Sequence, residues 1–343
     1  MFKINRLCCI GRDRAGIRWR SGLVAAVALA SAVVALHTRA QPAAPWPVKP
    51  VRFIVPFPPG GSVDPLARMT GARLGAALGQ QFVVDNRTGG SGSIGTALGA
   101  KSAPDGYTYV FVFDTHAVNP ALISNLPYNT LNDLASVMIV GTAPMVLTTN
   151  PAKPFNRFGD VVKQAKAKPE TLTFGSVGSG SLGHLAMMLV QQQAGIRMVH
   201  IPYKGGGPAT TDAIGGQIDF AMTSVAVPGP HIRAGRLRAV VTTGDKRSHV
   251  VPDTPTLIES GVKGLSAHAW WGIVTPAGLP GPLLDQVHSE LAKTYQQPDL
   301  RRQLTEQFGM DMVVGTPAAM SKFVAAEMAR WGKVVKDYNI RSD

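Results

Sequence analysis

The chain has 343 residues with 34 Lys and Arg, 21 Asp and Glu, and a formal net charge of +13 at pH 7. Its basic residues are scattered, without a run of four and without interleaved aromatic residues, and this argues against a nucleic-acid-binding protein. Positive charge of this kind instead indicates a mild preference for small anions.

The first forty residues have the pattern of a secretory signal peptide. Basic residues come first, then an apolar or small run from Gly22 to Leu36, then a small-x-small cleavage site at residues 38–40. The apolar run is short for a membrane span, and an uncleaved anchor is the alternative. Cleavage would lower the net charge to about +7 and remove Cys8 and Cys9. We therefore expect an exported protein that is stabilised by its core and not by disulfides.

The remaining part of the chain, roughly 300 residues, is long for one core and suits two lobes. Strand and helix signals alternate in βαβ order, which predicts an α/β fold with mostly parallel sheets covered by helices. The first set has strands at 51–57, 81–85 and 107–113. We expect Asp64 to be the N-cap of the first helix, with Pro65 as its first residue.

The pattern pauses around residues 145–154, and a second α/β set then begins. It comprises strands at 171–176, 197–203, 217–224 and 237–244 and a helix at 182–195. The final segments are amphipathic helices, which indicates a return to the first lobe. We expect residues 46–147 and 250–343 to form lobe 1 and residues 148–249 to form lobe 2. In the last helix an aromatic and apolar stripe predicts core packing: Met320, Phe323, Val324, Trp331, Val334, Val335 and Tyr338.

Glycines separate a strand from a helix start in three segments, at residues 56–65, 85–99 and 174–186. Such loops leave the N–H groups of a first helical turn unpaired and accessible, and these groups bind carboxylate or phosphate. One helix end contributes at most about 2 kcal/mol, whereas micromolar affinity needs about 8 kcal/mol. Several ends would have to converge on one ligand. Each loop by itself is equally consistent with an ordinary capping turn.

The middle loop also matches a dinucleotide-binding pattern. Gly90, Gly92 and Gly95 fit G-x-G-x-x-G, and Asp114 ends the next strand about twenty residues on. Against this interpretation, the polar segment 85–88 separates the glycines from the strand, and export removes the protein from cytosolic cofactors. A nicotinamide-dinucleotide-dependent oxidoreductase remains the alternative function.

Other catalytic signals are weak. No serine lies in a G-x-S-x-G elbow. The histidines are dispersed, with no H-x-H or H-E-x-x-H pattern, so we expect no metal site. Beyond the predicted signal peptide they are His116, His184, His200, His231, His249, His268 and His288. Asp64 could act as a general base, but its place before Pro65 makes it a helix cap first. We expect a binding protein without a cofactor and not an enzyme.

Five ordered stretches resemble the Bug family, the periplasmic solute-binding receptors of tripartite tricarboxylate transporters. They are "WPVKPVRFIVPFPPGGSVDPLAR", "VVDNRTGGSGSIGTALGAKSAPDGYT", "GSGSLGHLA", "HIPYKGGGPATTDAIGGQID" and "GIVTPAGLP". The resemblance implies a type II periplasmic-binding-protein fold with two lobes, joined by two crossing strands, that close over a small carboxylate. It also implies a monomer in the periplasm that delivers its ligand to a membrane permease.

The resemblance also implies the site residues. The loop after the first strand would form the ligand floor and hold bridging waters, while the helix start at "GSGSLGH" would receive the other end of the ligand. In lobe 1 these correspond to Phe57, Pro58, Gly60, Gly61, Ser62 and Asp64, together with Thr115 and His116. In lobe 2 they correspond to Gly178, Ser179, Gly180 and Ser181, with Tyr203 and Ser224 as neighbours.

Asp114 departs from the family pattern, because many members have a small neutral residue there. An anionic side chain near the cleft would repel a dicarboxylate unless a cation pairs with it. This suggests a ligand that carries a cationic or hydrogen-bond-donating group as well as a carboxylate.

Overall fold

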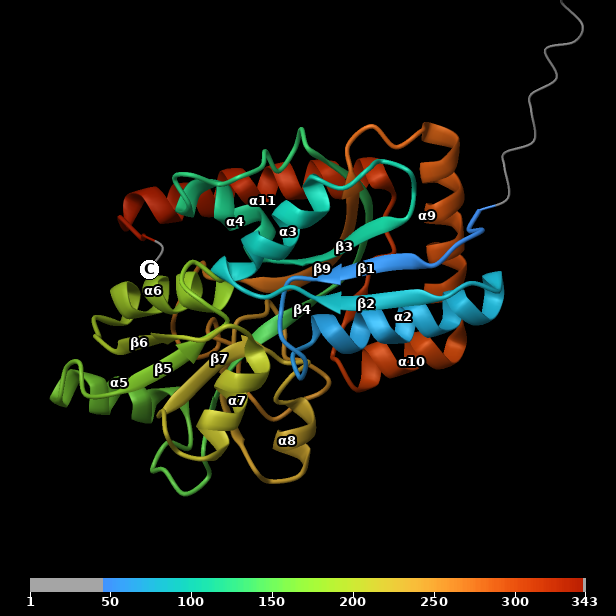
Figure 1. Cartoon of the computed structure of the whole chain (residues 1–343). Coiled ribbons are helices and arrows are strands. Elements are labelled where there is room, and N and C mark those ends of the chain that lie inside the picture. Colours follow the sequence, from blue (N-terminus) through green and yellow to red (C-terminus); the bar gives the residue numbers. More distant parts are fainter. Residues whose placement is uncertain (1–45, 342–343) are drawn as a thin grey trace, which may run out of the picture. The chain divides into compact units, whose positions relative to one another are not determined.

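The computed structural model describes residues 46–341 (Figure 1), so the predicted signal peptide and both cysteines lie outside the described residues. The strands are β1 (Val51–Val55), β2 (Phe82–Asn86), β3 (Thr108–Phe113), β4 (Leu134–Thr149), β5 (Thr173–Ser176), β6 (Val199–Pro202), β7 (Phe220–Ser224), β8 (Arg238–Thr242), β9 (His268–Pro276) and β10 (Asp311–Met312).

The α-helices are α2 (Val63–Leu78), α3 (Ser93–Ala100), α4 (Thr115–Leu122), α5 (Phe158–Ala167), α6 (Leu182–Ala194), α7 (Gly206–Ile214), α8 (Gly229–Arg233), α9 (Gly281–Gln296), α10 (Pro298–Glu306) and α11 (Pro317–Asp337). A short 3-10 helix, η1 (Gly90–Gly92), precedes α3. No helix in the described part of the chain is long and apolar enough to cross a membrane.

The strands form a sheet in the order β2-β1-β3-β9-β4-β7-β5-β6, and β8 and β10 each pair with β4. In the first half, which we call the β1–β3 half, β1 is parallel to β2 and β3, and β9 is antiparallel to β3 and β4. In the second, the β5–β7 half, β5 is parallel to β6 and β7, while β7 and β8 are antiparallel to β4. This is the predicted α/β architecture, with three parallel strands in each half.

Strand β4 belongs to both halves. Its residues up to Pro144 pair with β9, and those from Met145 onward pair with β7 and β8. The pause predicted around residues 145–154 is therefore partly wrong, because the strand continues through Thr149. β4 is buried along almost all of its length, so it lacks the alternating pattern by which strands are recognised.

Helices cover both faces of the β1–β3 half: α3, α4 and α11 lie on one side, and α2 and α10 on the other (Figure 1). Met320 and Val324 of α11 pack on Ile54, Val110 and Trp270 of the sheet. The core packing predicted for the last helix is thus confirmed. A separate cluster holds the β5–β7 half together, where α7 packs on β7 through Ala209, Ala213, Ile218 and Ala221.

The first helix begins earlier than predicted. Helix α2 starts at Val63, with Ser62 at the N-cap position, so Asp64 lies in the first turn and is not the cap. Asp64 accepts hydrogen bonds from Arg68 Nε and Asn86 Nδ2. These partners on the helix and on β2 explain why its carboxylate is not used to cap the backbone.

Candidate ligand-binding site

A small cavity of about 10 Å³ lies where the β1–β3 half meets the β5–β7 half. Residues from both halves line it: Phe57, Gly61, Ser62, Val63 and Phe113 from the first, and Val177, Gly206, Thr223, Ser224 and Val227 from the second. A volume of this size accommodates about one water molecule. Four of the predicted site residues, Phe57, Gly61, Ser62 and Ser224, therefore face a shared space.

Three buried hydroxyl groups belong to the cavity wall. The hydroxyls of Thr223 and Ser224 are buried and have no hydrogen-bond partner among the described residues. Ser62 Oγ accepts a hydrogen bond from Trp271 Nε1 at 3.1 Å, and Ser62 makes no side-chain cap of its own helix. Its hydroxyl proton is therefore available to a ligand. Unpaired buried hydroxyls are costly, so these groups point to a polar ligand.

Two helices begin at this cavity. Ser62 and Val63 stand at the start of α2, and Gly206 is the first residue of α7. The first N–H groups of a helix have no partner within it and carry partial positive charge. Donors and dipoles of both halves therefore favour an anion in the cavity.

The halves touch closely around the cavity. A Cβ on Gly207 would lie 2.8 Å from the backbone of Gly60, and one on Gly205 would lie 3.0 Å from the Pro58 ring. At another contact between the halves, Ser91 Oγ donates to the Ser179 carbonyl at 2.9 Å. Pro58, Gly60 and Ser179 are thus at contacts between the halves.

The loop before α6 is held by its own half. Ser181 Oγ donates to Ser176 Oγ at 3.2 Å, and Gly180 N donates to His184 Nδ1 at 3.1 Å. The rings of His184 and His200 stack with centroids 3.8 Å apart. His184 thus contacts the predicted loop at Gly180 and also stacks on His200, a pairing that the sequence spacing does not indicate.

Asp114 lies between β3 and α4, and Thr115 begins α4. Asp114 is only 2% exposed; its Oδ1 lies 3.4 Å from Leu182 N at the start of α6, and its Oδ2 has no partner among the described residues. Burial raises the pKa of Asp114 to about 8, against hydrogen bonding from Leu182. Thr115 is the first residue of α4 and is buried.

His116 is a buried neutral residue. Its ring lies edge-on to Trp270 with centroids 6.4 Å apart, and its Nδ1 has no partner among the described residues. Burial lowers the pKa of His116 to about 4, so the ring is uncharged at neutral pH. It is not among the residues that line the cavity.

Two other predicted residues face away from the cavity. The carboxylate of Asp64 is paired with Arg68 and Asn86, as described above. The hydroxyl of Tyr203 donates to Asp212 Oδ2 at 2.6 Å, and its ring lines a separate surface pocket with Pro59 and Gly60. Neither side chain is among those that line the cavity.

The glycines of the middle loop serve packing. A Cβ on Gly95 would lie 2.6 Å from the Arg87 carbonyl and 3.0 Å from Pro56 Cα, and one on Gly92 would lie 3.1 Å from the Phe57 ring. These glycines let α3 lie directly against the β1 loop. Close helix–strand packing therefore accounts for the spacing that resembles a dinucleotide motif.

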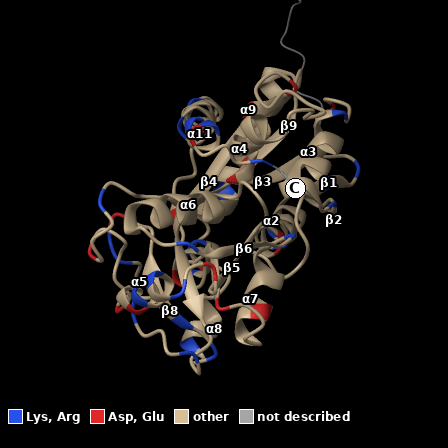
Figure 2. Cartoon of the chain, turned by 90° about the vertical axis from the view of Figure 1, so that its left-hand side faces the viewer, with Lys and Arg blue, Asp and Glu red and all other residues tan. Residues whose placement is uncertain are grey.

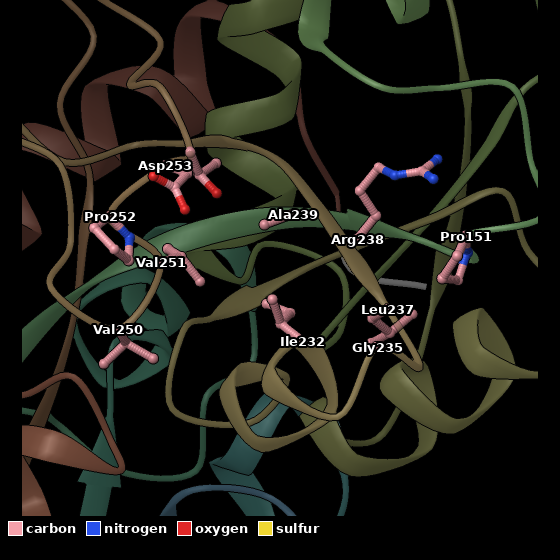
Figure 3. Close-up of a pocket in the computed structure, with 11 residues that line it drawn as sticks. Pro151, Ile232, Gly235, Leu237, Arg238, Ala239, Val250, Val251, Pro252 and Asp253 are labelled. Atoms are coloured by element: carbon pink, nitrogen blue, oxygen red, sulfur yellow. The ribbon is translucent and has the colours of Figure 1, made fainter.

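A larger pocket of about 400 Å³ lies beside β8 (Figure 3). Its lining includes Ile232, Leu237 and Val250, with Arg238 and Asp253 as the charged residues. Arg238 is already engaged, because it donates to the carbonyls of Lys153 and Phe155. We place the candidate site in the smaller cavity, where both halves and unpaired hydroxyls converge.

The sequence did not single out several lining residues. Val63, Phe113, Val177 and Thr223 are buried apolar or hydroxyl side chains that resemble core residues, and Val227 is a partly buried apolar residue. Gly206 had a signal, since it belongs to a run of three glycines before a helix. Trp271, which orients Ser62, looks in the sequence like an ordinary core residue of a strand.

Comparisons with known proteins agree with this architecture. Residues 66–340 match the family model of the tripartite tricarboxylate transporter family receptor. The protein BugT of Bordetella pertussis (strain Tohama I) is 36% identical over 294 residues, which cover 85% of this chain and 90% of BugT.

Two similar structures from Rhodopseudomonas palustris contain carboxylates. Rpa4515, solved with adipate, is 31% identical with a TM-score of 0.83, and the match covers 86% of this chain and 99% of Rpa4515. MatC (Rpa3494), solved with bound malate, is 28% identical with a TM-score of 0.79, and the match covers 84% of this chain and 100% of MatC.

The fold and these likenesses define a periplasmic solute-binding protein. The chain belongs to the family of tripartite tricarboxylate transporter receptors, to which the sequence resemblance to Bug proteins pointed. Proteins of this family are receptors and not enzymes, so the alternative of a dinucleotide-dependent oxidoreductase is wrong.

Proposed function

We propose that this receptor captures a small organic carboxylate in the cavity between its two halves and delivers it to the permease of a tripartite transporter. The supporting observation is the convergence of three buried hydroxyls and two helix starts on one space. A hydrogen bond to a charged group contributes about 1.5–3 kcal/mol. Hydroxyls and helix ends together can therefore reach the affinity that no single helix end supplies.

Binding requires the halves to separate and close again. The cavity of about 10 Å³ is far smaller than a dicarboxylate, and close contacts surround it. β4 joins the halves in one direction and the segment 243–267 joins them in the other. Residues at these connections would absorb the hinge motion, as in other binding proteins that close around a ligand.

The charge distribution also favours an anionic ligand. Residues 148–249 contain twelve Lys and Arg and five Asp and Glu, whereas the rest of the chain from residue 41 contains fifteen of each. Basic residues of this segment lie on α5 and around α8 (Figure 2). The β5–β7 half therefore carries the whole net charge of about +7, and this field attracts anions. Export through cleavage of residues 1–40 and a monomeric state complete the proposal.

A thermal-shift screen tests this function. The purified protein is melted alone and with succinate, glutarate, adipate, malate, pentanoate and 5-aminopentanoate. We expect at least one of these carboxylates to raise Tm in proportion to the logarithm of its concentration, because a ligand of the folded state stabilises it by mass action. Nicotinamide dinucleotides serve as the control and should leave Tm unchanged. A protein stabilised by none of the carboxylates would contradict the proposal.

A further inference from the structure

The Asp114 carboxyl group stands where the two halves face each other. In the sequence, Asp114 directly follows Phe113, which lines the cavity. Its contact in the other half, Leu182, comes five residues after Val177, which also lines the cavity. Oδ1 meets Leu182 N, the start of the 13-residue helix α6, at 3.4 Å. The start of α6 is therefore already occupied by an acid from the opposite half.

The Asp114 carboxyl group has few partners among the described residues that would stabilise its negative charge. Oδ2 has no partner among the described residues, although the side chain is 2% exposed. The charged neighbour on the packed helix α11 is Glu327, a second acid, which is itself paired with Arg330 and Trp331 Nε1. The nearby His116 is neutral. No described cation is paired with Asp114, so a cation supplied from outside would be stabilised there.

We infer that Asp114 makes this receptor select ligands that carry one carboxylate and one ammonium group over dicarboxylates of the same length. The inference rests on the proposed function, in which the ligand carboxylate binds to the hydroxyls and helix starts of the cavity. The other end of an extended ligand then lies towards Asp114 and the start of α6. A second carboxylate finds the start of α6 taken and no described cation beside it, whereas an ammonium group pairs with Oδ2.

Pairing of a ligand ammonium group with Asp114 should release a proton from Asp114. Burial holds the pKa of Asp114 at about 8, so the free receptor keeps this acid protonated at pH 7. An ammonium group beside it favours the ionised form. Binding of an amino acid type of ligand at pH 7 should therefore release close to one proton from Asp114, and binding of a simple monocarboxylate should not.

Titration calorimetry with matched ligands tests the inference. The probes are glutarate, pentanoate and 5-aminopentanoate, and the six-carbon set adipate, hexanoate and 6-aminohexanoate. For the wild type we expect the amino acid of each set to bind at least about tenfold more tightly than the dicarboxylate. Repeating the titration in buffers of different ionisation enthalpy measures the released proton.

Variants identify the residue responsible. Asp114→Asn should lose the tenfold preference and the proton release, while Asp105→Asn, which removes an exposed acid of the same half, should keep both. Asp114→Ser serves if the Asn variant fails to fold. Tighter binding of glutarate or adipate by the wild type, with a ratio that Asp114→Asn leaves unchanged, would overturn the inference while supporting the proposed function. A receptor that binds none of the six probes would overturn this inference, and it would overturn the proposed function as well if succinate and malate also fail to bind.

Discussion

Two buried titratable residues lie two positions apart at the start of α4 and respond oppositely to pH. Burial raises the pKa of Asp114 to about 8 and lowers that of His116 to about 4. Both shifts have one cause, the cost of placing a charge away from water. Both residues are therefore uncharged in the folded protein at neutral pH. On unfolding at this pH Asp114 ionises, whereas His116 becomes charged mainly below its ordinary pKa of 6.5.

Stability should fall as pH rises from 6.5 to 8. The folded-state pKa of Asp114 lies above its ordinary value of 3.8, so its contribution is complete below 3.8 and is lost as pH rises towards 8. The contribution of His116 is lost in the other direction, as pH falls from 6.5 towards 4. Between pH 6.5 and 8 the effect of Asp114 outweighs the small remaining effect of His116, so the free energy of unfolding should fall by about 1.3 kcal/mol.

Urea denaturation at pH 6.5, 7.0, 7.5 and 8.0 measures this slope. The Asp114→Asn variant should be nearly level over the same range, because it has no proton to lose. A wild-type slope that persists unchanged in the variant would place its origin elsewhere.

At the scale of elements, the start of α7 controls how closely the halves approach. A Cβ on Gly207 would lie 2.8 Å from the carbon and oxygen of Gly60, which is too close for real atoms. Gly207→Ala should therefore hold the halves apart at this point and weaken ligand binding, while leaving each half folded.

Small-angle scattering and calorimetry test this expectation together. We expect Gly207→Ala to have a larger radius of gyration than the wild type with ligand present, and a lower affinity. Gly215→Ala is the matched control at the other end of the same helix, where a Cβ would make only ordinary contacts of 3.6 Å or more. Equal closure and affinity in Gly207→Ala and the control would show that this contact does not govern closure.

Local sequence patterns predict most elements but not the strand that joins them. Strands β1, β2, β3 and β5 to β8 follow apolar runs bounded by glycine or polar residues, and their predicted spans overlap the observed ones. Strand β4 was missed because it is buried on both faces and contains Gly141 and Pro144, which usually mark breaks. Its pairing with β7, β8, β9 and β10 is decided by tertiary contacts that no local pattern encodes.

The same limit applies to the candidate site. Glycine-rich helix starts and the family resemblance led to Gly61, Ser62 and Ser224, which line the cavity. Asp64 and Tyr203 carry equally suggestive side chains, yet ion pairing and hydrogen bonding turn them elsewhere. The partner of Ser62 is Trp271, more than two hundred residues away. Long-range contacts of this kind decide which polar residue of a motif faces a ligand.

At the scale of the whole molecule, one ligand is expected to lie between two halves that both contribute to the cavity. Gly61 offers a way to block this space without disturbing the fold. The nearest atom to a Cβ on Gly61 would be the Pro58 carbonyl oxygen at 3.8 Å, so the backbone tolerates a side chain. Because Gly61 lines the cavity of about 10 Å³, the methyl groups of a valine would fill it.

The most direct test compares Gly61→Val with Gly159→Val by calorimetry, using whichever carboxylate stabilises the wild type most in the thermal-shift screen. Gly159 lies near the start of α5, where a Cβ has no atom within 4 Å. We predict that both variants melt like the wild type without ligand, that Gly159→Val binds normally, and that Gly61→Val loses at least about a hundredfold in affinity. Undiminished binding by a folded Gly61→Val protein would show that the ligand does not lie between the two halves at this cavity.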